Sequence, residues 1–406
     1  MARPGLSALV LSMTACGSMM ACGGGTGDPD DVGDATTGDS STGDSDGTDG
    51  TDSTDGTDTG ETGRPTRLLV TADWRAKRLS LVDYELLREG AQTREQALWR
   101  TIELPQWEPG PLEVELTPDA SKAVVSIAPG FFAGAGGSLV GAGPGTVPEG
   151  GALLVVEVDT GMVLAEIATA HYPMGIVVNA DGSEAWTANY GGNGQSGTTV
   201  SHVDLLAGTI IEELEVGPGP EQIDLDASGA RAIVNTAGDG SLRLFATADP
   251  LASLSPALAV SSDSSGVLFV DDGSDRAVVV NSGGPPGYSL LDVADPGAPA
   301  LIETVPVAGV AYAGVRGQQA DELLLSVLTG TAIALQRYDL NDGALIEQIE
   351  VPVIGLPLGL AYDADDQLAL CPVPGHNALV VADFSSGDHR IIDWQDLPGP
   401  THLSLR

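Results

Sequence analysis

The chain has 406 residues, of which 42% are hydrophobic and 4% aromatic, so it is long enough for one large all-β domain or for two to three ordinary ones. Its formal net charge is −40 at pH 7. A surface this acidic repels phosphate groups, which argues against nucleic acid and anionic lipid headgroups as partners, and it favours solubility in a salty habitat; we expect a monomer.

The first 22 residues, MARPGLSALVLSMTACGSMMAC, combine one early arginine with a short apolar run and small residues before cysteine. The run is too short to cross a membrane and predicts a secretory signal. The endings MTAC and MMAC resemble the lipobox of bacterial lipoproteins, although Met stands at the usual Leu position. This resemblance implies acylation of Cys22, with Cys16 as the alternative, and a protein anchored by lipid to the bacterial cell envelope. An ordinary cleaved signal with incidental cysteines is the other interpretation.

Residues 23–63 are rich in Gly, Thr and Asp and contain no basic residue. Such a segment buries too little apolar surface to offset the entropy of ordering it, and its like charges repel one another. We therefore predict a disordered acidic tether between the anchor and a domain at 64–406.

The domain at 64–406 repeats one unit of about 45 residues, seen in GPGPEQIDLDASGARAIVNTAGDGSLRLFATAD (217–249). This stretch predicts strands at 222–225, 232–235 and 242–246, and the preceding unit adds a fourth strand at 211–216. Copies of the first strand begin near residues 113, 175, 222, 267, 311, 359 and 402. A four-stranded unit with this period is typical of a β-propeller, so we predict an all-β, seven-bladed ring.

The two ends of the domain are expected to share one blade. The last copy provides only one strand, THLSL, whereas the domain begins with three strands at 67–73, 78–84 and 99–105. Joining them in one sheet leaves seven complete blades and no open sheet edge.

Parts of the repeat resemble a known family. AWTANYGGNGQSGTTVSHVDLLAG (185–208) and GPEQIDLDASGARAIV (219–234) are similar to the YVTN-type (YncE-like) repeat, and only blade 3 keeps the second-strand motif well. The resemblance implies a propeller and says little about activity.

Candidate ligand-binding residues lie in loops that a propeller gathers on one face. The insertion at 129–151 explains the one long spacing between repeats and carries two phenyl rings, which would either clamp a ligand or plug the axis. The candidates on this face are Trp74, Phe131, Phe132, His171, Tyr190, Tyr288 and His376.

A second candidate site lies along the ring axis. Strict alternation of side chains along the innermost strands would bring polar residues together there, namely Glu113, Glu115, Gln222, Asp224 and His402. Oxygen ligands with one imidazole would suit a divalent cation, most plausibly Ca²⁺. The alternative is a hydrated lining that holds no metal.

No nucleophile elbow, phosphate-binding loop, zinc-protease motif or haem-attachment motif occurs in the sequence. We therefore expect a lipid-anchored module that binds a protein, glycan or envelope ligand and is not an enzyme. The alternative is a lactonase or other hydrolase that uses a metal on the axis, since seven-bladed lactonases are built on a similar ring.

Overall fold

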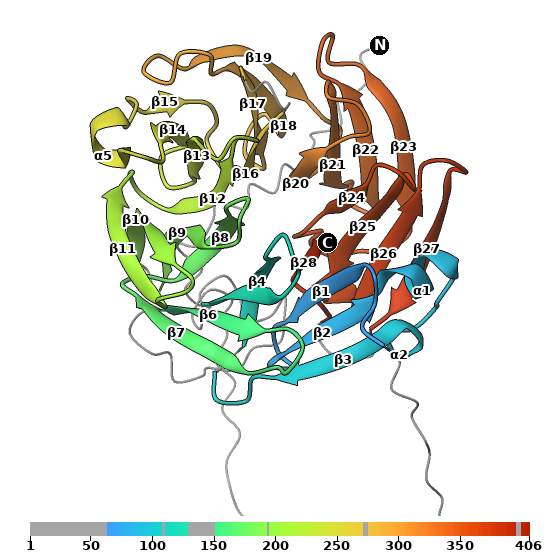
Figure 1. Cartoon of the computed structure of the whole chain (residues 1–406). Coiled ribbons are helices and arrows are strands. Elements are labelled where there is room, and N and C mark those ends of the chain that lie inside the picture. The colour runs from blue at the N-terminus through green and yellow to red at the C-terminus, as the bar shows by residue number, and fades with distance from the viewer. Residues whose placement is uncertain (1–62, 108–109, 129–150, 193–194, 271–274, 395–398) are drawn as a thin grey trace, which may run out of the picture. The chain divides into compact units, whose positions relative to one another are not determined.

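The computed structural model describes residues 63–107, 110–128, 151–192, 195–270, 275–394 and 399–406. The predicted signal peptide and nearly all of the predicted tether lie outside these ranges. The described chain forms seven antiparallel sheets of four strands, arranged in a ring (Figure 1). The predicted all-β, seven-bladed propeller is confirmed.

The strands of each blade run from the ring axis outward. Blade 1 consists of β28 (His402–Leu405), β1 (Leu68–Asp73), β2 (Arg78–Asp83) and β3 (Leu98–Glu103). Blade 2 consists of β4 (Pro111–Leu116), β5 (Lys122–Ile127), β6 (Gly151–Glu157) and β7 (Val163–Thr169). Blade 3 consists of β8 (Pro173–Val178), β9 (Glu184–Gly192), β10 (Gln195–Asp204) and β11 (Thr209–Glu215). Blade 4 consists of β12 (Pro220–Leu225), β13 (Arg231–Thr236), β14 (Ser241–Ala246) and β15 (Leu258–Ala259).

Blades 5 to 7 follow the same plan. They are β16 (Ser264–Phe269), β17 (Arg276–Asn281), β18 (Gly287–Asp292), β19 (Ala300–Pro306); β20 (Val310–Arg316), β21 (Glu322–Leu328), β22 (Ile333–Asp339), β23 (Leu345–Val351); and β24 (Ala361–Asp363), β25 (Leu368–Val373), β26 (Ala378–Asp383), β27 (Asp388–Asp393). The described helices are short: α1 (Tyr84–Glu89), α2 (Arg94–Ala97), α5 (Pro250–Ser253) and the 3₁₀ turn η1 (Pro374–His376). None of them is long and apolar enough to cross a membrane.

The hydrophobic core is divided among the interfaces between blades. One apolar cluster lies between each pair of neighbouring blades. Between blades 1 and 2, for example, Val70 and Leu81 share a cluster with Val125 and Leu154. Because a single sheet buries its faces only against its neighbours, each blade depends on a closed ring for its stability.

The ring closes as predicted, with the last strand completing the first blade. β28 pairs antiparallel with β1, where Leu69 lies opposite Leu405 and Ala72 opposite His402. The innermost strands β4, β8, β12, β16, β20, β24 and β28 contact one another in turn around the axis. Leu403 of β28 is only 3% exposed, so the closing strand belongs to the core.

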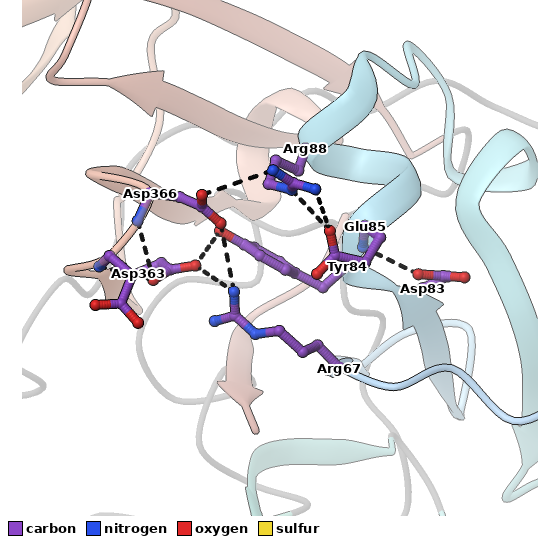
Figure 2. Close-up of polar contacts among 8 residues, drawn as sticks. Arg67, Asp83, Tyr84, Glu85, Arg88, Asp363 and Asp366 are labelled. Carbon is purple, nitrogen blue, oxygen red and sulfur yellow. Dashed lines mark hydrogen bonds and ion pairs between the residues drawn. The ribbon is translucent and has the colours of Figure 1, made fainter.

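A polar cluster between the first and the last blade strengthens this closure, and the sequence analysis does not predict it. We call Arg67, Tyr84, Asp363 and Asp366 the closure cluster (Figure 2). Asp363 accepts hydrogen bonds from the Arg67 guanidinium (2.6 Å) and the Tyr84 hydroxyl (2.7 Å), and Arg67 also lies 3.4 Å from Asp366. These contacts join the start of blade 1 to the turn after β24 of blade 7.

The helix α1 explains why Tyr84 takes part in the closure cluster. Asp83 ends β2 and accepts a hydrogen bond from the Glu85 N–H at 2.9 Å, which caps the helix, and Gly90 ends it with φ of 119°. The predicted strand 78–84 therefore stops one residue early. Its last residue, Tyr84, begins a helix and lies buried beside Asp363.

Candidate functional site

Three of the five predicted axial residues lie together at the end of the axis where the innermost strands begin. The Gln222 amide donates a hydrogen bond from Nε2 to Glu113 Oε1 at 2.7 Å. His402 Nε2 lies 4.0 Å from Glu113 Oε2, and its Nδ1 lies 3.3 Å from the Val114 carbonyl. The three side chains come from blades 4, 2 and 1, so this contact spans several blades.

A glycine in blade 3 makes the contact between Gln222 and Glu113 possible. A Cβ atom at Gly175 would lie 2.6 Å from the Gln222 Cα, 2.7 Å from its Oε1 and 2.8 Å from the Glu221 carbonyl oxygen. Only a residue without a side chain lets blade 4 approach the axis this closely.

We predict that Gly175→Ala destabilises the domain by about 1–3 kcal/mol, because the new methyl group overlaps backbone atoms that have little room to move. Urea unfolding measures the change. Gly375→Ala is the matched control, since a Cβ atom there would meet only Gly355 Cα at 3.8 Å. Equal stability of the two variants would contradict this packing.

The other two predicted axial residues lie further along the strands and have different partners. Glu115 forms an ion pair with Arg406. Asp224 accepts hydrogen bonds from the backbone N–H groups of Leu225 (2.9 Å) and Phe269 (2.8 Å). Burial raises the pKa of Asp224 to about 6, and these N–H groups and the charge of Arg316 oppose the increase.

This pKa predicts how stability changes with pH. The folded Asp224 carboxyl keeps its proton up to about pH 6, whereas an unfolded Asp releases it near pH 4. Between these values the folded state binds more protons, so stability falls as the pH rises. We predict that Asp224→Asn makes this fall shallower in urea unfolding between pH 4 and 7. The exposed control Asp365→Asn should keep the wild-type slope, and an unchanged slope in Asp224→Asn would contradict the assignment.

Two further carboxylates were missed by the sequence analysis, namely Glu221, on which the charge of Glu113 acts, and Asp263, whose charge acts on Glu221. Burial and the charges of Asp263 and Glu113 raise the pKa of Glu221 well above its ordinary value. Burial also raises the pKa of Asp263 and of Glu113, and in Glu113 the charge of His402 and the hydrogen bond from Gln222 oppose the increase. We call Glu113, Glu221, Gln222, Asp263 and His402 the axial cluster.

Strict alternation fails at the axial cluster because the innermost strands are irregular where they begin. The register of β12 with β13 shifts between Pro220 and Ile223, and β4 and β8 show the same shift. A bulge of this kind lets consecutive residues turn away from their expected faces. Glu221 and Gln222 can therefore both lie near Glu113, as the hydrogen bond from Gln222 and the effect of the Glu113 charge on Glu221 indicate. In the sequence, the only signal for Glu221 was its position next to Gln222, a predicted axial residue.

The structure does not assemble the predicted axial residues into a metal site. Within the described ranges, no three His, Cys, Asp or Glu side chains are grouped so that they could hold a metal ion. Glu115 pairs with Arg406, and Asp224 accepts hydrogen bonds from backbone N–H groups. The Ca²⁺ hypothesis therefore has no preformed ligand set among the described residues and stays a prediction.

The predicted loop face is brought together only in part. Trp74 is fully buried in an apolar cluster with Leu112, Tyr172 and Met174, and Tyr190 packs against it half-buried. These residues therefore pack against one another in an apolar cluster. His171 lies next to this cluster in sequence and is half-buried, whereas His376 is exposed in η1.

Two further predictions on this face have different outcomes. Tyr288 is wrong as a loop residue: it belongs to β18 and is fully buried between blades 5 and 6, where its ring meets Tyr338 edge-on at 5.5 Å. The predicted loop SGGPPGY (282–288) overlaps the first two residues of β18, Gly287 and Tyr288. Phe131 and Phe132 lie outside the described residues.

Comparison with known proteins supports the architecture. No protein-family model matches the chain, and no curated protein matches its sequence. The resemblance to the YVTN-type repeat therefore stays a prediction.

Among solved structures, the chain is similar to a protein of unknown function from Desulfotomaculum acetoxidans (TM-score 0.64, 13% identity, 83% of this chain and 98% of that chain). It is also similar to candidate 6-phosphogluconolactonases of Bacteroides fragilis (0.60, 14%, 84% and 98%) and Bacteroides uniformis (0.60, 15%, 84% and 99%). At these identities the likeness establishes the fold alone, so the chain shares its propeller fold with proteins of differing description.

Proposed function

We propose that this chain is a lipid-anchored propeller of the bacterial cell envelope that binds a protein, glycan or other envelope ligand at the axial cluster. The observation that carries the proposal is the contact of Glu113 in blade 2 with Gln222 of blade 4 and His402 of blade 1, and burial also raises the pKa of Glu113. Perturbed ionisable groups of this kind concentrate at binding and catalytic sites. The half-exposed side chains of Glu221, Gln222 and His402 make the cluster reachable from solvent.

The binding role is tested by comparing variants of the full chain on a glycan array and a peptide array. We expect ligands whose signal is lost in Glu113→Gln, which removes the charge at the centre of the cluster. Glu350→Gln, an exposed change on the outermost strand of blade 6, should keep the wild-type pattern. Ligands lost equally from both variants would place binding elsewhere, and an array without ligands would contradict a glycan or peptide role.

The proposed address depends on acylation of Cys22, which lies outside the described residues. We predict that Cys22→Ser abolishes labelling by a fatty-acid probe and releases the protein from the membrane, because acyl chains contribute about 0.8 kcal/mol per buried CH₂. Labelling and fractionation of producing cells measure the change. If only Cys16→Ser has this effect, acylation is at the other cysteine; if neither does, the lipid anchor is wrong.

A second candidate function is hydrolysis of an ester or lactone, favoured by one observation. His402 lies 4.0 Å from Glu113, so an imidazole and a carboxylate are placed within reach of one bound water. The negative charges of the axial cluster disfavour a phosphorylated substrate, however. Ester and lactone screens with and without chelator test this candidate. Turnover that Glu113→Gln abolishes would support a hydrolase over a binding module.

A further inference from the structure

We propose that His202 is a pH-sensitive brace of blade 3: its imidazole ring holds the outermost strand β11 when both ring nitrogens are protonated, and releases it when the ring is neutral. The inference goes beyond the proposed function and does not depend on the axial cluster. It is carried by two carboxylates on the two nitrogens of the ring, by an indole ring stacked on its face and by the burial of the ring.

The ring of His202 has a carboxylate beside each of its nitrogen atoms. His202 lies on β10, opposite Trp186 of β9 and Glu212 of β11, so it stands between the two neighbouring strands of blade 3 (Figure 1). Its Nε2 is 3.0 Å from Glu184 Oε2 and its Nδ1 is 3.4 Å from Glu212 Oε1. A neutral imidazole has one donor and one acceptor, whereas the protonated ring has two donors. Only the protonated ring can donate to both carboxylates at once.

The indole ring of Trp186 lies flat against the imidazole ring. The two ring centroids are 3.9 Å apart and the ring planes are inclined by 8°. Trp186 is buried and meets Phe245 of blade 4 at a centroid distance of 5.2 Å, which fixes the indole in place. The face of an aromatic ring carries partial negative charge and attracts a cation. The stack therefore favours the protonated ring and sets its plane.

Burial of the ring makes its two carboxylate contacts effective. His202 is 8% exposed, whereas Glu184 and Glu212 are half-buried. Charges beside a buried ring are screened less than charges at an open surface. Because both glutamates also reach water, either of them can turn toward solvent when its contact with the ring is lost.

The other charged groups on the neighbouring elements have partners of their own. Asp204, at the end of β10, accepts hydrogen bonds from two backbone N–H groups of the following turn at 2.8 Å. On β11, Glu213 and Glu215 accept hydrogen bonds from hydroxyl groups of β10. In blade 4, Arg243 donates to two backbone carbonyls and Asp249 caps α5. In the part of the chain that the structure describes, the two glutamates beside the ring are the charged groups paired with it.

Loss of one proton from the ring should release Glu212 and keep Glu184. The remaining proton stays where the hydrogen bond is shorter, which is on Nε2 facing Glu184. Nδ1 then turns a lone pair toward the Glu212 carboxylate, and two acceptors repel each other. Since Glu212 belongs to β11, the outermost strand of blade 3 loses a side-chain contact with β10.

The test compares urea unfolding of the full chain and its variants between pH 5 and 8, the range in which imidazoles change their charge. At pH 5, Glu212→Gln should raise the equilibrium constant for unfolding about threefold, as expected for a partly exposed ion pair. This difference from the wild type should disappear by pH 8. Glu184→Gln should keep most of its difference at every pH. His389→Gln, which changes an exposed histidine of β27, should match the wild type.

Nitrogen NMR of the histidine rings provides a second measurement, because it shows which ring nitrogen carries the proton. We expect the neutral ring of His202 in the wild type to carry its proton on Nε2. A neutral ring protonated on Nδ1 would overturn the proposal, and this measurement does not depend on the folding of any variant. A difference between Glu212→Gln and the wild type that stays constant from pH 5 to 8 would also overturn it, since a merely structural contact has no such pH profile.

Discussion

Removing residues 399–406 is expected to leave a protein that aggregates or melts far below the wild type. This truncation deletes β28, so β1 loses its partner strand and the ring exposes sheet edges. It also removes Leu403, whose burial alone is comparable to core leucines that contribute about 2–5 kcal/mol. The total loss approaches the whole stability of an ordinary domain, about 5–15 kcal/mol.

Calorimetric melting and light scattering measure this loss. Deletion of residues 23–63 is the control, because the sequence of the predicted tether contains only one larger apolar side chain, Val32. Its melting transition should coincide with that of the full chain. A protein truncated after Pro398 that melts like the full chain would show that the ring does not depend on β28.

The second large effect is expected for Asp363→Asn in the closure cluster. Asp363 is 6% exposed and accepts hydrogen bonds from both Arg67 and Tyr84. Removing its charge leaves the guanidinium partly buried beside a weaker partner, which should cost about 2–3 kcal/mol. Asp365→Asn is the matched control, since this neighbouring side chain is exposed. Equal unfolding midpoints for the two variants would contradict a stabilising closure cluster.

The same carboxylate predicts behaviour at low pH. Burial acts to raise the pKa of Asp363, but the hydrogen bonds from Arg67 and Tyr84 outweigh it and lower the pKa to about 2. Because the folded pKa is below the unfolded value near 4, the contribution of Asp363 is complete above pH 4 and is lost as the pH falls through about 2. In a pH series, the difference in the free energy of unfolding between Asp363→Asn and the wild type should therefore disappear as the pH falls through about 2.

The ring could be predicted from the sequence because its signals are local and repeated. Each blade contributes the same alternation of apolar residues and Gly- or Asp-rich turns, and the strands of 217–249 begin within two residues of their predicted positions. Closure followed from counting strands at the two ends. A repeated pattern averages out local errors, so the architecture depends on no single residue.

The axial site could be predicted only in part, because it depends on irregularities that a regular pattern omits. Glu113, Gln222 and His402 were found by alternation, but the bulge in β12 brings in Glu221, which alternation assigns to the other face. Arg406 pairs with Glu115 from a position beyond the last repeat. Neither effect is encoded in the period of the sequence.

The burial of two aromatic residues also could not be predicted from the sequence pattern. Trp74 and Tyr288 stand beside glycine- or charge-rich turns, as exposed binding residues often do, yet both are fully buried. Their side chains fill space between elements distant in sequence, for example between Trp74 and Tyr172. Which large side chain fills such a space depends on three-dimensional packing.

The most direct test of the account is a crystal structure of the full chain bound to a ligand identified on the glycan or peptide arrays. We predict density for the ligand beside Glu113, Gln222 and His402, the three side chains that meet at the axis. Density for the ligand confined to the outer strands, with the axial cluster holding only water in saturated crystals, would contradict the claim that this cluster is the binding site.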